Sequence, residues 1–376
     1  MILLATGCTG DHPRTLKRTL TLRDSGGIVI AEQESVEQFT AKVVLSTRPF
    51  LDLGGVSENP DAELSPQAPW LEPVRLSDGR YAVADMQRIA LFSADGRFIK
   101  GVGSQGDGPG EFQQVGRVCV LPDDSLLAIS ENDGRLILWD SAGRHVATYA
   151  RVGPVLIDSC FADGSVIVPT IEGGAPGDSD MSAQRGTDQS RVAYYRVRRD
   201  GAVIANLGEF PRSRLDAEVS YVVQVYYAHG RLIVADPRSF QLRQYDTTGT
   251  LRSIVRLTKP PPPHRRPVFA RPRPGRAPFS VTAPGVSSAA QATEPAFGRV
   301  LVDSLGRYWI QGGDTETEKW TFIDAKHGIG ARLAFPILKD RVTSRIVSAA
   351  TDHVVVLSYD DDGAPHLRFC RFAVVP

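Results

Sequence analysis

Charged side chains recur at the ends of short apolar segments. They are the groups in this chain that could bind a ligand or take part in catalysis. The candidates are Asp85, Arg88, Asp133, Asp236, Arg238 and Lys319. Carboxylate and guanidinium groups in such positions could bind polar or anionic ligands through charge-assisted hydrogen bonds. An Asp at the end of a strand can also cap the amides of the following turn, so their repetition fits a structural role as well.

Two longer segments carry opposite charges. Residues 169–190 contain Glu172, Asp178, Asp180 and Asp188, whereas 259–278 contain four consecutive prolines and several arginines. We take Arg265, Arg266 and Arg271 as candidate ligand-binding residues on a basic strap in extended polyproline geometry, facing anionic ligands. The alternative is a solvated insertion without a ligand, which the composition also fits.

Enzyme motifs do not occur in recognisable form. The run Asp360-Asp361-Asp362-Gly363 lacks the alternating spacing of a calcium loop, and the histidines form no H-E-x-x-H pair. A G-x-S-x-G nucleophile elbow and a Walker loop are absent from the sequence. We therefore assign no catalytic residue and no metal ligand, and we expect no cofactor.

The overall charge of the chain narrows the choice of partner. Its 376 residues include 43 basic and 43 acidic side chains, so the formal net charge is zero. A neutral chain has no overall field to attract nucleic acid or anionic lipid. No apolar run approaches the roughly 18 residues of a membrane-spanning helix. We expect no nucleic-acid partner, and membrane contact only through a lipid anchor.

The charged positions belong to a repeated unit of short strands. In 88–96 and again in 135–143, a basic residue opens an apolar stretch, a bulky residue closes it and a polar turn ends in Gly. The closing residues Phe92 and Trp139 lie 47 positions apart. Such repeats predict an all-β fold, a six-bladed β-propeller of four-stranded antiparallel blades over residues 21–376, with a Pro/Arg-rich insertion at 258–297. The last blade lacks an outer strand, and Ala41–Leu45 is the expected donor that closes the ring.

Several of these segments resemble a known group of proteins. The stretch from Gly103 to Phe112 resembles the blade-joining signature of NHL-repeat propellers, as does the turn from Phe92 to Gly96. The layout is similar to that of bacterial six-bladed propeller proteins, many of which carry lipoprotein signals and most of which have unknown function. It departs from them at 259–296, where Pro-rich sequence replaces a more helical insert. The resemblance implies the fold and a location in the cell envelope, and it implies no activity.

The cysteines bear on localisation and on cross-linking. The stretch from Leu3 to Cys8 resembles the end of a bacterial lipoprotein signal, so we expect residues 1–20 to be a shortened signal and tether and Cys8 to be lipidated. The alternative is a frayed terminus with a chance cysteine. Cys119 and Cys160 fall in the inner strands of consecutive blades, where a disulfide is possible. We favour buried free thiols.

The order of strands places the long segments on one face. In a four-stranded blade the A–B and C–D turns share one rim, while the B–C loops and the crossovers between blades share the other. Tight turns such as Asp78-Gly79 fall on the first rim, and segments 169–190 and 258–297 fall on the second, which we call the loop-bearing face. The inner strands are expected to begin with polar residues that form a mixed-charge rim: Arg75, Arg117, Asp158, Gln224 and Arg299.

Two functions fit these observations. We favour a monomeric, envelope-anchored binding module without catalytic activity, periplasmic or on the outer membrane, whose loop-bearing face takes a peptide, glycan or protein partner. The alternative is a propeller hydrolase or lyase with a divalent metal at the channel mouth, held by carboxylates or histidines from several blades. Spacing in the sequence leaves this alternative open because such ligands come from different blades.

Overall fold

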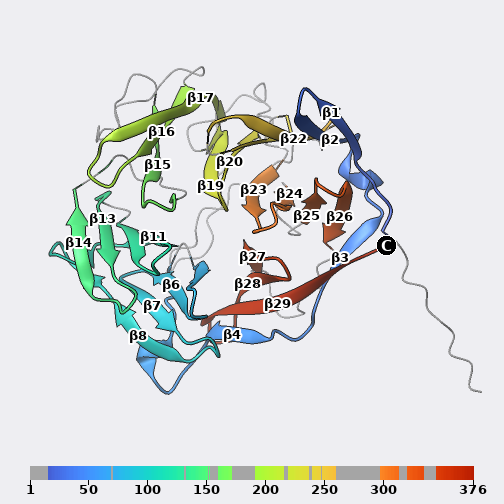
Figure 1. The fold of residues 1–376 in the computed structure, drawn as a ribbon. Coiled ribbons are helices and arrows are strands. Elements are labelled where there is room, and N and C mark those ends of the chain that lie inside the picture. The colour runs from blue at the N-terminus through green and yellow to red at the C-terminus, as the bar shows by residue number, and fades with distance from the viewer. Residues whose placement is uncertain are drawn as a thin grey trace, which may run out of the picture.

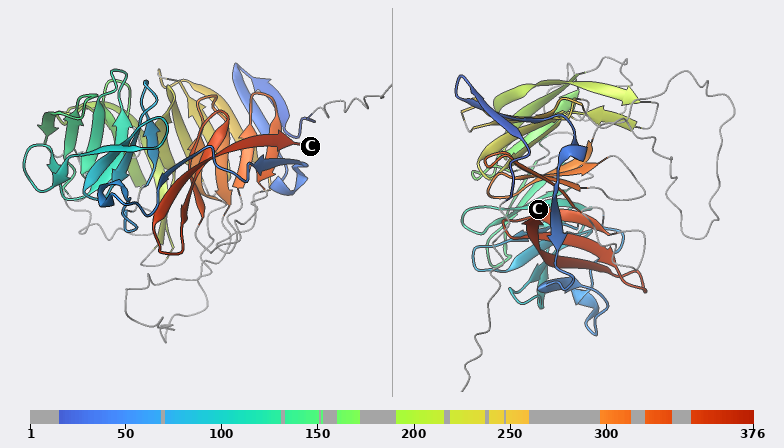
Figure 2. Two further views of the ribbon diagram at one scale, coloured as in Figure 1. Left: turned by 90° about the horizontal axis from the view of Figure 1, so that it is seen from below. Right: turned by 90° about the vertical axis from the view of Figure 1, so that its right-hand side faces the viewer.

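The chain forms a ring of antiparallel sheets that stand side by side around a central axis (Figure 1). The computed structural model describes residues 16–68, 71–130, 133–150, 152, 160–171, 191–215, 219–236, 239–246, 248–259, 297–312, 320–333 and 344–376. The two further views in Figure 2 show the strands running through the thickness of a flattened disc. The described residues include two short 3₁₀ helices, Val36–Gln38 and Pro60–Ala62. The predicted all-β propeller with six blades is confirmed.

The first three blades follow one another along the chain. Blade 1 consists of β5 (Pro73–Arg75), β6 (Tyr81–Asp85), β7 (Arg88–Phe92) and β8 (Phe98–Val102). The short parallel pair β9 (Ser104–Gln105) and β10 (Glu111–Phe112) leads to blade 2, which consists of β11 (Val115–Val120), β12 (Leu126–Ser130), β13 (Leu136–Trp139) and β14 (His145–Tyr149). Blade 3 contains β15 (Val166–Ile171), β16 (Arg191–Val197) and β17 (Val203–Leu215), which also pairs with β18 (Val219–Val222). Within the described residues, its inner strand is represented by the bridge between Cys160 and Val166.

The other three blades complete the ring. Blade 4 consists of β19 (Gln224–Ala228), β20 (Arg231–Asp236), β21 (Gln241–Tyr245) and β22 (Leu251–Leu257). Blade 5 consists of β23 (Phe297–Val302), β24 (Tyr308–Gly312), β25 (Trp320–Asp324) and β26 (Ile329–Leu333). Blade 6 consists of β27 (Arg345–Ala349), β28 (His353–Tyr359) and β29 (Pro365–Val375), with an outer strand donated by the N-terminal part of the chain.

The N-terminal part of the chain contributes four strands to blades 4, 5 and 6. The hairpin of β1 (Thr21–Ser25) and β2 (Ile28–Gln33) extends blade 4 by pairing in parallel with β22. The outer strand of blade 6 is β4 (Leu51–Gly54), which pairs with residues 366–369 of β29. The expected donor β3 (Ala41–Leu45) also pairs with β29, but at 372–375, where it bridges to β26 of blade 5. Closure by N-terminal chain is therefore confirmed, and it uses two strands because β29 is long enough to pair with both.

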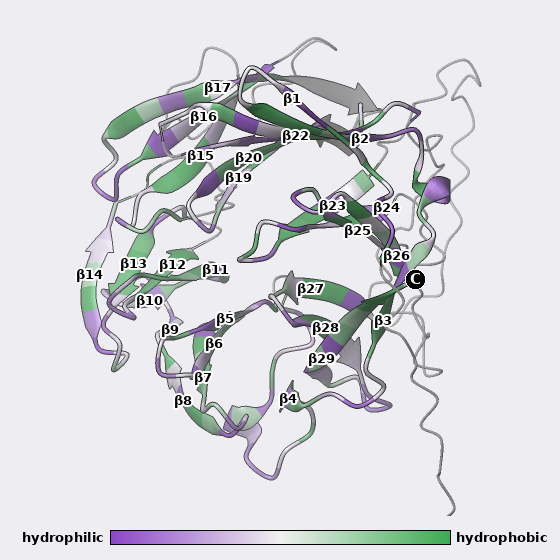
Figure 3. Cartoon of the chain, turned by 45° about the vertical axis from the view of Figure 1, so that its right-hand side comes forward, coloured by the Kyte–Doolittle hydropathy of each residue, from purple (hydrophilic) through white to green (hydrophobic). Residues whose placement is uncertain are grey.

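The hydrophobic core is divided among the contacts between blades. The described residues form six buried clusters, and each lies between two neighbouring blades around the ring. The second strands β6 and β12 are buried along their whole length because neighbouring blades cover both of their faces. Figure 3 shows the hydrophobic colour concentrated on the strands and the hydrophilic colour at the turns. A single blade would expose both faces of its sheet, so the ring is the unit that buries the core.

The tight turns predicted by the Asp-Gly pairs are present and are tied to neighbouring blades. Gly79 closes the A–B turn of blade 1 with φ of +92°, a conformation that glycine adopts without strain. On the same rim, the Ser77 hydroxyl donates to the Asp124 carboxylate at 2.6 Å, which joins blades 1 and 2. Arg80 donates to the carbonyl of Ser141 at 2.9 Å across the same pair of blades. The side chains of this rim therefore connect neighbouring blades.

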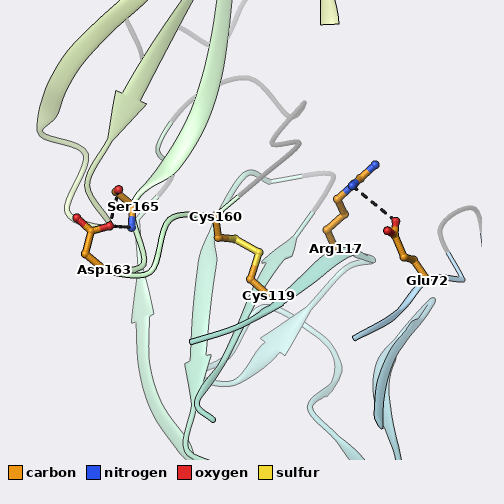
Figure 4. The surroundings of a disulfide bond; sticks show 6 residues. All are labelled: Glu72, Arg117, Cys119, Cys160, Asp163 and Ser165. Carbon is orange, nitrogen blue, oxygen red and sulfur yellow. Dashed lines mark hydrogen bonds and ion pairs between the residues drawn. A yellow bond between two sulfur atoms is a disulfide. The ribbon is translucent and has the colours of Figure 1, made fainter. Parts of the chain in front are cut away.

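The expectation of free thiols at Cys119 and Cys160 is wrong, because a disulfide joins them. Their Cα atoms lie 6.2 Å apart, within the range that a disulfide spans. Cys119 lies on β11, and Cys160 lies beside Val166 at the inner edge of blade 3. Radial packing brings the inner edges of consecutive blades together, which places the sulfur atoms in reach of each other. The bond links blades 2 and 3 (Figure 4), while Cys370 is a buried free thiol.

Candidate functional site

The inner strands enclose a cavity of about 670 Å³ around the ring axis. Its walls come from β5, β11, β19, β23 and β27 together with Cys160, so all six blades contribute. Binding sites for small molecules have volumes of about 300–1,000 Å³. The cavity is therefore large enough for a small ligand, and the chemistry of its lining determines which ligands it fits.

A charged cluster lies where the inner strands begin. Glu72 directly precedes β5, and its Oε2 atom accepts a hydrogen bond from Nη2 of Arg299 at 3.0 Å. The same oxygen lies 3.7 Å from Nη1 of Arg117, an ion pair that Figure 4 marks with a dashed line. These three side chains are 27–29% exposed, so they face the cavity and are partly desolvated. We call these three residues and Arg345 the channel cluster; the charge of Arg345 acts on Arg299, but Arg345 is not among the residues that line the cavity.

The fourth member, Arg345, opens β27 of blade 6. Burial lowers the pKa of the Arg299 guanidinium; the negative charge of Glu72 opposes this effect, and the positive charges of Arg117 and Arg345 add to it. The Glu72 carboxylate thus contacts the guanidinium groups of Arg299 and Arg117, and the charge of Arg345 acts on Arg299. A guanidinium group presents a planar fork of donors that suits the oxygen atoms of a carboxylate, as the contacts with Glu72 illustrate.

Irregular pairing occurs beside the arginines on their inner strands. The register between β11 and β12 shifts between Val115 and Arg117, and that between β23 and β24 shifts between Phe297 and Val300, the interval that contains Arg299. The inner strand of blade 6 has a corresponding shift just after Arg345. A bulge bends the strand and changes the direction of nearby side chains, and bulges are frequent beside functional sites.

The remainder of the lining is apolar or aromatic, with one histidine. Val118, Val300 and the two tyrosines of β19, Tyr226 and Tyr227, contribute to the wall. His229 lies at the A–B turn that follows β19, at the opposite end of the inner strands from the channel cluster. Burial lowers the pKa of His229, although the negative charge of Asp303 opposes the shift. The positive charge of Arg231 also lowers the pKa of His229, so the uncharged imidazole is favoured at this end of the inner strands.

Two of the sequence-predicted residues, Asp85 and Arg88, hold the segment before blade 1. Asp85 is 4% exposed, and its Oδ1 atom accepts a hydrogen bond from the amide of Ser65 at 2.6 Å. Arg88 donates from Nε to the other oxygen of Asp85 at 3.0 Å and from Nη2 to the carbonyl of Glu63 at 2.6 Å. Both side chains are thus engaged in local structural contacts, and neither lines the cavity.

Asp133 has a similar set of contacts in blade 2. Its carboxylate accepts hydrogen bonds from the amide and the Nε atom of Arg135, at 3.1 and 2.6 Å. Arg135 in turn donates to the carbonyl of Asp107 in the crossover between blades 1 and 2. Asp236 ends β20 opposite Gln241. The other predicted residues, which lie outside the described part of the chain, are Cys8, Arg238, Arg265, Arg266, Arg271 and Lys319.

Some of the polar residues expected at the starts of the inner strands lie together at the cavity. Arg117, Gln224 and Arg299 line the cavity, and Gln224 donates from its side-chain amide to the carbonyl of Gly298 at 2.5 Å. Arg75 lies instead at the end of β5 and is exposed, while Asp158 falls outside the described residues. Sequence reasoning missed Glu72 and Arg345. Their position at the start of an inner strand was the available signal, because Glu72 precedes β5 and Arg345 opens β27.

Neither a metal cluster nor a membrane helix is found in the part of the chain that the structure describes. Among those residues, no three His, Cys, Asp or Glu side chains are grouped so that they could hold a metal ion. The described residues also contain no helix that is long and apolar enough to cross a membrane.

Comparisons with known proteins support the fold. The family model DUF5128, described as a 6-bladed beta-propeller, matches residues 70–151. A Bacteroides fragilis protein, provisionally named an exported protein, is similar in structure with a TM-score of 0.53 and 11% identity, over 88% of this chain and 95% of that one. A DUF4221 member from Bacteroides vulgatus has a TM-score of 0.52 and 12% identity, over 89% and 99% of the two chains. At these identities the likeness shows the fold alone. No curated protein matches the sequence.

Proposed function

We propose that this protein is an exported binding module whose ligand enters the ring at the loop-bearing face and is polar or anionic. The observation that carries the proposal is the central cavity, in which the guanidinium groups of Arg117 and Arg299 converge on the Glu72 carboxylate at the starts of the inner strands. Those starts lie on the same side as the crossovers between blades. A peptide, a glycan or a protein segment with exposed carboxylates has the chemistry that this site recognises.

In this proposal, the candidate residues of the loops also contact the ligand, outside the cavity. Arg265, Arg266 and Arg271 would add positive charge beside the mouth, while Asp236, Arg238 and Lys319 would contact polar groups of the partner. Asp85, Arg88 and Asp133 would act through the segments they hold, because their described contacts are local. We propose that the protein acts as a monomer and without a cofactor.

Replacing Arg265, Arg266 and Arg271 by Ala should slow association with anionic polymers. Under the proposal these arginines contact the partner and not the core, so the melting temperature should be unchanged, because surface charges contribute little to folding. The probes are poly-L-glutamate and alginate, flowed over the immobilised protein. We expect binding in 50 mM salt that weakens several-fold in 300 mM salt, since screening shortens the reach of exposed charges to under about 10 Å.

The matched control replaces three exposed arginines of the C–D turns, Arg97, Arg144 and Arg198, which lie on the tight-turn rim. This control should associate as the unaltered protein does. Equal slowing in both triple variants would mean that the overall charge, and not the loop-bearing face, drives binding.

We propose that the chain is a lipoprotein of the NHL-repeat propeller type, attached to the cell envelope through Cys8. The small-residue run before Cys8 and the exported protein of similar fold support this location. Cys8→Ser should move the protein from the membrane fraction to the soluble envelope fraction, because the thioether to the lipid can no longer form. Immunoblots of fractionated cells expressing the full gene product provide the measurement. A membrane-bound Cys8→Ser protein, or a soluble unaltered one, would refute the anchor.

A hydrolase or lyase with a metal at the channel mouth is the second candidate. It would need carboxylates or histidines grouped at the mouth, and the described residues supply Glu72 alone in the channel cluster. Elemental analysis of the purified protein tests this candidate directly. A divalent ion present in stoichiometric amount, and lost together with a hydrolytic activity on chelation, would favour the enzyme over the binding module.

A further inference from the structure

We propose that the disulfide between Cys119 and Cys160 is a modification site in the central cavity, where a small thiol attaches by thiol–disulfide exchange. The reactant is a low-molecular-weight thiol, and a folded protein reductant is excluded by its size. This inference does not depend on the ligand of the proposed function. It therefore goes beyond that function, and the two can be tested separately.

The disulfide lies where a solute in the cavity can contact it. Both cysteines belong to the wall of the cavity, and both are partly exposed. The other cysteine among the described residues, Cys370, is 7% exposed and is not part of this wall. Thiol–disulfide exchange requires that the attacking thiolate reach a sulfur atom of the bond. The position of Cys119 and Cys160 meets this requirement.

The sulfur atoms lie near the tight-turn end of the inner strands. Cys119 is the fifth of the six residues of β11, and the A–B turn of blade 3 separates Cys160 from its bridge partner Val166. His229 lines the same end of the cavity. The ion pair of Glu72 with Arg299 lies towards the other end, so exchange at the disulfide does not depend on how those charges are paired.

The walls of the cavity limit which thiols can reach the bond. Its volume of about 670 Å³ is that of a small-molecule site. The reactive cysteine of a protein reductant belongs to a folded domain, and a domain of about 100 residues has a radius of gyration of about 13 Å. Such a domain cannot enter the ring. A thiol of the size of cysteine or glutathione can enter it.

The exchange proceeds in two steps that conserve electrons. The thiolate sulfur of the small thiol attacks one Sγ atom and forms a new S–S bond with it, while the bond between Cys119 and Cys160 breaks. The electron pair of the broken bond stays on the other Sγ atom, which leaves as a thiolate and takes a proton from water. The product carries one mixed disulfide and one free thiol. When a second small thiol attacks the mixed disulfide at the sulfur of the attached thiol, both cysteines become free and the small thiol leaves as its oxidised dimer.

Contacts next to Cys160 hold this edge of blade 3 in place when the bond opens. The ring of Phe161 packs against that of Tyr227, with the two centroids 4.1 Å apart. The guanidinium carbon of Arg196 lies 4.0 Å from the centroid of the Phe161 ring. Cys119 is held by the pairing of β11 with β12. We therefore expect the exchange to occur in the folded protein, without prior unfolding.

Mass spectrometry of the folded chain tests the site. In the variant Cys8→Ser/Cys370→Ala, the remaining cysteines are Cys119 and Cys160. After brief incubation with reduced glutathione and a quench with N-ethylmaleimide, we expect a chain that carries one glutathione and one maleimide, both on these two cysteines. Melting curves under the same conditions verify that the protein is folded. The same variant with Cys119→Ala and Cys160→Ala added is the matched control and should take up neither reagent.

A comparison with an unshielded disulfide measures the protection that the ring gives. The disulfide-linked peptides that trypsin releases from the oxidised protein contain the same bond without the ring. We expect glutathione to open the bond in the folded protein at a rate within about tenfold of its rate on the peptides. Thioredoxin, a protein dithiol reductant, should be at least about a hundredfold slower on the folded protein than on the peptides.

Two results would overturn the inference. If glutathione opened the bond in the peptides and left the folded protein unchanged, the cavity would not admit a small thiol. If the folded protein slowed thioredoxin no more than it slows glutathione, exclusion by size would be wrong. Neither result bears on the proposed function, whose probes are poly-L-glutamate and alginate and contain no thiol. Failure of those probes to bind would overturn the proposed function and leave this inference standing.

Discussion

Leu53→Asp should open the ring and have the largest effect on stability. Leu53 is fully buried on β4, in the cluster that packs blade 6 against blade 1. Truncating a buried leucine costs about 2–5 kcal/mol, and a buried unpaired carboxylate adds to that cost. We expect a loss of at least about 4 kcal/mol, which lowers the melting temperature of a chain this long by about 5 °C or more. Detachment of β4 would also expose the edge of β29, so oligomers should appear on size-exclusion chromatography.

The control for this prediction is Val44→Asp on β3. Val44 is 46% exposed, and its side chain points away from the core that its neighbour Val43 enters. We expect a monomer whose melting temperature is close to that of the unaltered protein, because a surface substitution of this kind costs little. If Leu53→Asp behaved like Val44→Asp, β4 would not contribute to closing the ring.

Removing the disulfide should have the second largest effect. Cys119 and Cys160 are separated by 41 positions, and the loss of entropy in the unfolded chain closed by such a bond corresponds to about 4 kcal/mol. We expect the double variant Cys119→Ala/Cys160→Ala to melt about 5 °C lower. Addition of a thiol reductant should lower the melting temperature of the unaltered protein to a similar value.

Cys370→Ala provides the comparison, because Cys370 is a buried thiol outside the bond. Its melting temperature should still fall when reductant is added, since the disulfide remains. The double variant should not respond to reductant at all. If the unaltered protein were equally insensitive, Cys119 and Cys160 would not be linked in solution.

Much of the fold could be predicted because its signals are local. The segment Arg88–Phe92 and the turn that ends in Gly96 predict a strand and its hairpin turn within nine residues. Both signals are local, because strand propensity and a positive φ angle depend on residues that are close in the sequence. The repeat of that unit then indicates a propeller. The donor strand was harder to predict, because Ala41–Leu45 and Leu51–Gly54 both alternate between buried and exposed residues.

The candidate site was less predictable. Arg117 and Arg299 were recognised as polar starts of inner strands, but nothing near them in the sequence indicates that they meet at Glu72. The pattern that contains Asp85 and Arg88 recurs along the chain, and recurrence cannot distinguish a cap from a ligand contact. In the structure both side chains contact the segment at 63–65.

The sequence by itself determined the strands, the tight turns and the number of blades, because each depends on residues close together in the chain. Only the tertiary structure decided which distant groups meet. Arg299 lies 227 positions from Glu72, and Cys160 lies 41 positions from Cys119. Their contacts depend on how the blades pack around the axis, on the bulges beside Arg117 and Arg299, and on which N-terminal strand closes the ring. These are properties of the closed ring, since a single blade can neither bury both of its faces nor enclose a channel.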